Sequence, residues 1–363
     1  MNSLIEELKK VKDFRRSQGK RYPLWLILLI IILGTMQGYL GYRALGDFAK
    51  ANQGLIGKKF KIFSEKVPSY STMRRVLMGV DWLQLQQIFN QWSGNLCESD
   101  EFSDWVCIDG KSLKSTVKNY ENHCQNFVVM VSLYSQIDGV VLGVKRFENK
   151  HSSEIQEAQE LIRDCSLKNK VFTLDALHCQ KPTLQSIVES GNHYVVPVKK
   201  NQKKLYQSLE SATKNKKPRS ISLEQEQSHG RTLSRQVLVF KSLDSLKPDW
   251  CGVESLIRVE RWGTRGNKDY YQVAYYISSL LEKAQVLGTI IRGHWQIENR
   301  LHWVKDVIFK EDNSQIHHFQ ARTNLSILQT LAINLFRLLG FSSITEGQRW
   351  LNNRWFWLWI LLE

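Results

Sequence analysis

The chain has 363 residues, which is long enough for two or three domains with substantial cores. Hydrophobic residues make up 42% of it and charged residues 23%, a balance that argues against a disordered chain. Fifty Lys and Arg residues against 35 Asp and Glu residues give a formal net charge of +15. That excess predicts attraction to a polyanion, most often a nucleic acid, although a soluble basic protein without such a partner has the same composition.

Two further features bear on the cellular compartment. The six cysteines lie far apart and form no C-x-x-C pair, which indicates free thiols in a reducing cytoplasm and neither a disulfide framework nor a zinc knuckle. The apolar run "PLWLILLIIIL" (23–33) is about half of the ~20 residues that a membrane span requires. It starts too late for a signal peptide. We therefore expect a buried helix here, a cytoplasmic protein and no membrane association.

Residues 1–98 have the periodicity of a helical domain. Helices are expected over 3–14, over the apolar run, over 42–52 and over 71–92, with Ser71 as the N-cap of the last. Arg74, Arg75 and nearby lysines make this region basic. A DNA-binding domain and a dimerisation or packing domain fit these features about equally.

From residue 101 the period changes to that of strands. Strands are expected over 103–110, 126–135, 140–148, 170–176 and 193–199, with helices over 152–165 and 180–191. Asp138-Gly139 is a hairpin turn signal between the second and third strands. Ser153 and Gln156 are spaced for a capping box at the first helix.

This order of elements predicts a particular sheet. An antiparallel hairpin followed by right-handed crossovers is the order of the ribonuclease H-like fold, in which the first and fourth strands lie side by side. Asp109 and Asp175 each end one of these strands. Since open α/β sheets place their sites at the carboxyl ends of the strands, we expect the two carboxylates to lie close together.

The rest of the chain divides into three parts. Residues 199–283 combine a basic stretch that begins at Lys199, expected as a loop, with a β insertion over 235–280. The basic stretch fits a solvated loop and a phosphate-contacting surface equally well. Helices at 284–309 and 320–339 complete a catalytic core made of 99–198 and 284–340. A Trp-rich tail occupies 341–363, and its packing or oligomeric role is open.

Two neighbouring aspartates repel each other unless a cation lies between them, and hard oxygen ligands favour Mg²⁺ or Mn²⁺ over zinc. A third carboxylate is expected on the helix "HWQIENRLHWVKD" (294–306), where Glu298 shares a face with His294, His302 and Lys305. Its competitors are Asp306, Glu311 and Asp312.

Trp295 and Trp303 on the same helix are expected in the core. A zinc site is disfavoured because the H-E-x-x-H order is absent.

Five segments together resemble the DDE transposases of bacterial insertion sequences, in particular the H-repeat-associated (ISAs-type) group. They are "IDGKSLKST" (108–116), "TLDALHCQ" (173–180), "YVVPVKKNQKKL" (194–205), "SHGRTLSR" (228–235) and "IRGHWQIENRLHWVKDVIFKED" (291–312). The resemblance covers nearly the whole chain. It implies a ribonuclease H-like core with a β insertion and an acidic triad of Asp109, Asp175 and Glu298.

The resemblance also implies an activity and its partners. Such an enzyme cleaves DNA at the terminal repeats of the element with two Mg²⁺ ions, or Mn²⁺ in their place, and joins the freed 3′-OH to target DNA. A homodimer is expected to hold the two ends. Contacts to DNA are expected from Lys111, Lys199, His229, Arg231, Arg235, Trp262, His294 and Lys305, where Trp262 would stack on a base.

Within the superfamily's helix signature, Glu298 and Lys305 keep the expected spacing, whereas Ile291 and His294 stand where Tyr and Arg are usual. Two alternatives remain open. The chain could be an inactive or domesticated copy that only binds terminal repeats, or it could be a ribonuclease H-like nuclease that acts on another nucleic acid.

Overall fold

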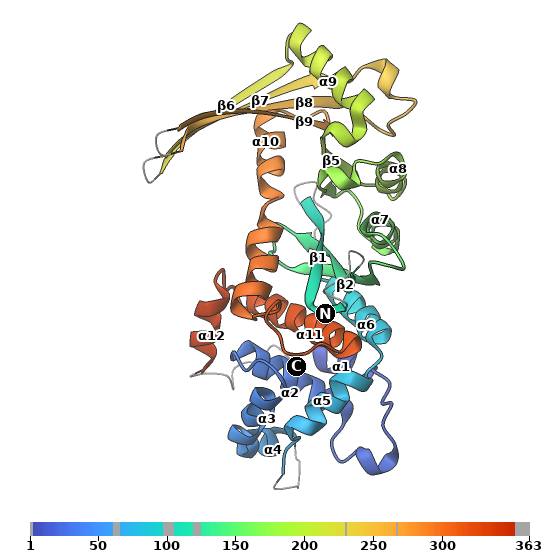
Figure 1. The fold of residues 1–363 in the computed structure, drawn as a ribbon, viewed down its shortest axis with the longest axis vertical. Helices are drawn as coiled ribbons and strands as arrows, with labels where there is room; N and C mark the ends of the chain where they lie inside the picture. The colour runs from blue at the N-terminus through green and yellow to red at the C-terminus, as the bar shows by residue number, and fades with distance from the viewer. Residues whose placement is uncertain are drawn as a thin grey trace. The chain divides into compact units, whose positions relative to one another are not determined.

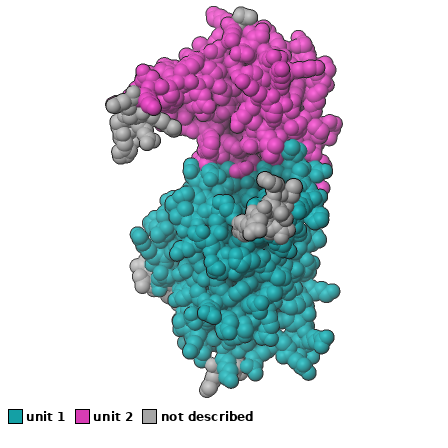
Figure 2. Space-filling view, in the orientation of Figure 1, with its two compact units in different colours: residues 1–98, 110–157, 297–363 teal, residues 99–109, 158–296 magenta. Residues whose placement is uncertain are grey.

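The computed structural model describes residues 3–60, 66–96, 105–118, 125–228, 231–265 and 268–352. The chain forms two compact units, each built from segments that are distant in sequence (Figure 2). Unit 1 comprises 1–98, 110–157 and 297–363, and unit 2 comprises 99–109 and 158–296. The expected catalytic core, 99–198 with 284–340, therefore contributes residues to both units.

Unit 1 contains the N-terminal helices (Figure 1). They are α1 (Leu4–Lys9), α2 (Leu24–Met36), α3 (Tyr42–Ala51), α4 (Gln53–Phe60), α5 (Tyr70–Gly79) and α6 (Trp82–Gly94). The stretch expected as one helix over 71–92 is two, because Asp81 caps a new helix by accepting a hydrogen bond from the amide of Leu83 at 3.1 Å. The N-cap of α5 is Ser69 and not Ser71.

The apolar run forms α2, in which every residue except Trp25 is buried. One segment of the described chain, Ser17–Met36, is long and apolar enough to cross a membrane, but 72% of its most apolar window is buried in the protein. The buried helix expected here is thus confirmed. It packs against α11 (Phe319–Leu338), whose residues 321–337 are all buried. Helix α11 also contacts α5 and α6, so it is the centre of the unit 1 core.

The hairpin of unit 1 forms as expected. Strand β2 (Asn126–Ser135) pairs antiparallel with β3 (Val141–Glu148). Gly139 has a φ of 70° in the turn, a conformation that glycine adopts without a Cβ penalty. Helix α7 (Glu154–Asp164) follows, and Ser153 Oγ accepts a hydrogen bond from the amide of Gln156 at 3.3 Å. This is one half of the expected capping box. The last helix of the described chain is α12 (Ile344–Asn352), and the Trp-rich tail beyond it lies outside the described residues.

Strand β1 (Trp105–Lys118) is longer than expected and belongs to both units, with residues 105–109 in unit 2 and 110–118 in unit 1. Its first residues pair in parallel with β4 (Val171–Thr173), and β4 pairs in parallel with β5 (His193–Val198). The expected neighbours, the first and fourth strands, are confirmed. The strand order is β3-β2-β1 in unit 1 and β1-β4-β5-β9-β8-β7-β6 in unit 2.

The remaining strands of unit 2 are β6 (Ser220–Ser228), β7 (Arg231–Lys241), β8 (Ser255–Arg265) and β9 (Lys268–Ser278). They continue the sheet of unit 2, because β9 pairs antiparallel with β5. Helix α10 (Ala284–Gly293) packs on one face of it through Leu287, Ile290 and Ile291. Helix α9 (Lys203–Asn215) covers the other face (Figure 1). Unit 2 also contains α8 (Lys181–Glu189), which contacts β5.

The basic stretch after Lys199 was expected as a loop, and this prediction was wrong. It is mostly α9, which is amphipathic: Leu205 and Leu209 are buried while its three lysines are exposed. Tyr206 of α9 stacks edge-to-face on Tyr275 of β9, with ring centroids 5.1 Å apart. Strand β6, which follows, was not predicted. It is the edge strand of the sheet, and its apolar residues Ile221 and Leu223 are exposed. The strand therefore lacks the buried apolar face by which the other strands were recognised.

Candidate metal-binding carboxylates and their surroundings

In unit 2, the strand register places Asp109 and Asp175 at equivalent positions. Cys107 of β1 pairs with Thr173 of β4, and each aspartate lies two residues beyond its member of this pair. Neighbouring strands lie about 4.8 Å apart. Asp175 follows the end of β4, as expected, and caps a short 3₁₀ turn (Ala176–His178) by accepting the amide hydrogen of Leu177 at 2.8 Å. Asp109 was expected at a strand end, but β1 continues through it to Lys118.

His294 lies next to these strands within unit 2. Its Nδ1 is 3.1 Å from the Thr173 hydroxyl, and its backbone oxygen accepts a hydrogen bond from the Cys107 thiol. Burial lowers the pKa of His294 to about 4, against the opposing charge of Asp175. His294 is therefore neutral at pH 7. Although it occupies the position of an arginine in the superfamily signature, it does not supply the positive charge of that arginine.

In unit 1, Glu298 lies on a π-helical segment, Glu298–His302, which is followed by a second one, Val304–Ile308. The expected helix over 284–309 thus changes from α to π geometry after α10, a change that is frequent at functional sites. Glu298 Oε2 lies 3.1 Å from Nδ1 of His302. This hydrogen bond, together with the charge of Lys111, lowers the pKa of Glu298, so the carboxylate is ionised at neutral pH.

Lys111, expected as a phosphate contact, forms ion pairs with two carboxylates of unit 1. Its Nζ lies 2.6 Å from Asp306 and 3.3 Å from Asp312. Burial alone would lower the pKa of Lys111, but Glu311 and Asp306 raise it above its ordinary value. The ammonium is therefore charged, and its charge is offset by its neighbours. Asp306 and Asp312, two competitors for the role of the third metal ligand, are the residues that offset it.

Lys305 was expected to contact phosphate beside Glu298, and the structure contradicts this expectation. The side chain is buried, with Nζ 3.1 Å from the Ser326 hydroxyl of α11. Burial lowers the pKa of Lys305. A buried ammonium cannot reach a DNA phosphate, so we assign it to the core of unit 1.

The core around Lys305 holds a buried ion pair that no sequence signal predicted. Arg322 Nη2 lies 2.6 Å from Glu311 Oε1 and 2.9 Å from Gln329 Oε1, and the side chains of both Glu311 and Arg322 have no exposed surface. Burial would raise the pKa of Glu311, but the charges of Lys305 and Arg322 hold it at about 2. Glu311, the remaining competitor for the metal, is thus committed to this pair.

The two tryptophans of the helix were expected in the core, and this prediction was wrong. Trp295 is 62% exposed in unit 2, and Trp303 is 51% exposed in unit 1. The expectation assumed a continuous α-helix. The change to π geometry after α10 alters which side chains share a face.

The other expected DNA contacts are distributed over unit 2. Lys199 is exposed immediately after β5. Arg235 of β7 is half-buried, 3.5 Å from Glu224 of β6. Trp262 of β8 is half-buried between Ser234 and Tyr271 on the neighbouring strands. Arg231 begins β7, but its side chain is outside the described part of the structure, and so is the whole of His229.

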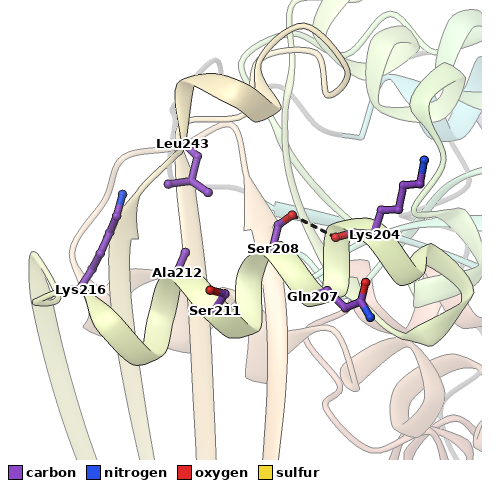
Figure 3. Close-up of a pocket in the computed structure, with 7 residues that line it drawn as sticks. All are labelled: Lys204, Gln207, Ser208, Ser211, Ala212, Lys216 and Leu243. Atoms are coloured by element: carbon purple, nitrogen blue, oxygen red, sulfur yellow. Dashed lines mark hydrogen bonds between the residues drawn. The ribbon is translucent and has the colours of Figure 1, made fainter.

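A pocket of 690 Å³ lies along α9 in unit 2 (Figure 3). It is lined by Lys204, Gln207, Ser208, Ser211, Ala212, Lys216 and Leu243. Ser208 donates a hydrogen bond to the backbone oxygen of Lys204 at 3.0 Å, so this hydroxyl is used within the helix. Two of the seven lining residues are lysines, three are uncharged polar residues and two are apolar, and the candidate metal ligands are not part of the lining.

The family described as "Transposase DDE domain" matches residues 101–335, and the family described as "DDE_Tnp_1-associated" matches residues 5–93. The chain is 28% identical to the "H repeat-associated putative transposase YhhI" of Escherichia coli K12 over 92% of this chain and 90% of that protein. It is 30% identical to the "Putative transposase YncI" of Escherichia coli O157:H7 over 93% and 88% of the two chains. The protein therefore belongs to the DDE transposase family, and its relatives include H repeat-associated members.

Proposed function

We propose that the protein cuts DNA strands at the ends of an insertion sequence and transfers the resulting 3′-OH to target DNA. The observation that carries the proposal is the register of unit 2, which gives Asp109 and Asp175 equivalent places on neighbouring strands. Glu298, which is kept ionised in unit 1, is the proposed third member of the acidic triad. Its position in the helix signature supports this choice.

The family implies a divalent metal, and the chemistry of the proposed ligands fits one. All three are carboxylates, whose hard oxygen atoms suit Mg²⁺, and Mn²⁺ can take its place. When bound, two such ions would stabilise the attacking and leaving oxygens of an in-line displacement at a DNA phosphate. Such a displacement needs no covalent bond between protein and DNA.

The chain's own residues have separate tasks in this proposal. Asp109, Asp175 and Glu298 hold the metal. His294 is neutral at pH 7, so near the DNA it would act as a hydrogen-bonding group and not as a charge. Lys199, Arg231 and Arg235 are the proposed phosphate contacts in unit 2, together with His229.

Trp262 is proposed to stack on a displaced base. Lys111 is ion-paired with Asp306, so a phosphate would have to compete with that carboxylate. We do not propose Lys305 as a contact, since it is buried.

We also propose that strands β1 to β5 form a ribonuclease H-like core. Their antiparallel hairpin and the parallel pairs β1–β4 and β4–β5 support this assignment.

Two copies of the chain would bring the two ends of the element together. The net charge of +15 favours binding of the protein to the DNA backbone.

The experiment incubates the full chain with duplex DNA that carries the sequences flanking its gene, in the presence of Mg²⁺ or Mn²⁺. We expect cleavage that leaves a 3′-OH, followed by strand transfer. Asp109→Asn, Asp175→Asn and Glu298→Gln should each lower the cleavage rate about 1000-fold, which is about 4 kcal/mol in the transition state. Asp138→Asn, in the β2–β3 turn, is the matched control and should cleave normally.

Each other outcome rejects the proposal in a different way. Binding to the flanking DNA without cleavage would show a DNA-binding copy. Cleavage that does not depend on the flanking sequences, and that is not followed by joining, would show a nuclease. Normal cleavage by Asp109→Asn would remove that residue from the site.

A further inference from the structure

The contact between His302 and Glu298 has no role in the family motif described above. Both residues belong to the same π-helical segment of unit 1, with His302 Nδ1 3.1 Å from Glu298 Oε2. The two side chains differ sharply in exposure: that of His302 is 5% exposed and that of Glu298 is 56% exposed. A buried ring therefore holds one end of an accessible carboxylate.

The direction of this hydrogen bond follows from the charge of Glu298. An ionised carboxylate only accepts hydrogen bonds, so Nδ1 of His302 must carry the hydrogen. The Glu298 side chain is 56% exposed to water, where a glutamate is ionised at neutral pH. A carboxylate has about four lone-pair sites on its two oxygens. One bond from His302 thus leaves sites for a metal while it restricts rotation of the group.

The backbone that carries His302 is itself fixed to the core of unit 1. The amide of Phe309 donates to the oxygen of Val304 at 3.0 Å, and the amide of Glu311 donates to the oxygen of Lys305 at 2.8 Å. The Lys305 side chain then reaches Ser326 of α11. The Lys305–Ser326 bond connects the stretch after His302 to α11, whose residues 321–337 are buried, and the ring of His302 is itself only 5% exposed.

We propose that His302 is a positioning residue that orients the Glu298 carboxylate for metal binding. This inference rests on the proposed function, since it assumes that Glu298 is a metal ligand. Groups that hydrogen-bond to a metal ligand typically change metal affinity 10- to 100-fold when they are removed. A purely structural histidine would affect folding and leave the affinity of the folded protein unchanged.

Three substitutions at one position test the proposal. In His302→Asn the amide nitrogen lies as many bonds from the backbone as Nδ1, so it can still donate to Glu298. In His302→Gln the amide nitrogen corresponds instead to Nε2. We expect Mn²⁺ binding to the full chain, measured from the electron paramagnetic resonance signal of the free ion, to weaken about 10-fold or more in His302→Ala and His302→Gln. His302→Asn should stay within about 3-fold of the unsubstituted protein.

The matched control is His317→Ala. His317 also lies in unit 1, and its Nδ1 contacts the backbone oxygen of Ser115 at 2.8 Å, so its loss removes a histidine contact without touching Glu298. Circular dichroism and the melting temperature of each variant establish that it is folded. Equal losses in the Ala, Asn and Gln variants, or no loss in any of them, would reject a positioning role.

The inference and the proposed function can fail separately. If Glu298→Gln abolishes Mn²⁺ binding and cleavage while the three His302 variants behave like the unsubstituted protein, the function stands and the role of His302 is rejected. If the unsubstituted protein binds Mn²⁺ but does not cleave DNA, the proposed activity fails. The affinities of His302→Ala and His302→Asn still decide the role of His302 in that case.

Discussion

The two units hold their candidate carboxylates by different physical means. In unit 2, the hydrogen-bonded register of β1 and β4 places Asp109 and Asp175, and the histidine beside them is neutral. In unit 1, Glu298 lies on a π-helical segment, where its side chain contacts the buried ring of His302. Main-chain pairing thus places the two aspartates of unit 2, whereas Glu298 of unit 1 is held by a side-chain contact.

This difference has an energetic consequence. A strand ladder satisfies its polar groups within the backbone and tolerates many side chains. A buried ion pair depends on both partners, because removal of one leaves an uncompensated charge in the interior. Unit 1 should therefore be the more sensitive of the two to single substitutions of polar residues.

The largest effect is expected for Glu311→Gln, which leaves Arg322 without its charged partner. Both side chains are fully buried and 2.6 Å apart, so the free energy of unfolding should fall by about 3–5 kcal/mol. Urea unfolding followed by tryptophan fluorescence measures it. The control is Glu6→Gln, which breaks an exposed pair of the same length with Lys9 in the same unit and should cost less than about 1 kcal/mol. Equal losses in the two variants would mean that burial does not decide the strength of the pair.

The second prediction concerns pH and His294 in unit 2. Its pKa in the folded protein, about 4, lies below its ordinary value of 6.5, so the unfolded chain takes up the proton first as the pH falls. The stability that depends on neutral His294 is complete above pH 6.5 and is lost between pH 6.5 and about 4. The size of this loss is about 3 kcal/mol.

His294→Gln removes this titration, so urea unfolding at a series of pH values should show a shallower decline in that window. His151→Gln, at an exposed histidine of unit 1, is the control and should leave the decline unchanged. If the profile of His294→Gln matched that of the unsubstituted protein, His294 would not be the neutral, buried group described above.

A smaller effect is expected at Thr173, whose hydroxyl lies 3.1 Å from Nδ1 of His294 and 3.0 Å from the Cys107 sulfur. Thr173→Val keeps the shape of the side chain and removes the hydroxyl, which should lower the free energy of unfolding by about 1–2 kcal/mol. Thr173→Ser keeps the hydroxyl and should recover part of this loss. A smaller loss in the Val variant than in the Ser variant would show that packing of the methyl group matters more.

The smallest effect is expected for Trp303→Gln in unit 1. With half of its side chain exposed, Trp303 contributes little to the core, and the substitution should change stability by no more than about 0.5 kcal/mol. The matched residue is Trp92 of α6, which is 4% exposed in the same unit, and Trp92→Gln should cost about 3 kcal/mol or more. Similar costs for the two variants would restore the interpretation of Trp303 as a core residue.

Several elements could be predicted from the sequence because local patterns determine them. The β2–β3 hairpin follows from alternating apolar residues on either side of Asp138-Gly139, and α2 follows from an unbroken apolar run. The parallel neighbours β1 and β4 follow from the order of strands and helices. Asp109 and Asp175 could also be located from a local pattern, because each comes directly after a short apolar run that predicts a strand.

Other elements could not be predicted, because long-range contacts override local preference. The break at Asp81 and the helix α9 lie in stretches with mixed signals. The π geometry after α10 changes the faces of the helix without any change in the spacing of its residues. The spacing of four residues predicted that His302 and Glu298 share a face of the helix. It did not predict that the ring of His302 is buried and contacts the Glu298 carboxylate.

Motifs spread over nearly the whole sequence are enough to identify the family, and with it the carboxylates proposed to hold the metal. The tertiary structure sets the state of the groups around them: His294 is neutral, Lys305 is buried, Glu311 is buried and charged, and Trp303 is exposed. The physical reason is that charge and protonation depend on how far a group is removed from water. Segments such as α11, which are distant in the sequence, bury these groups.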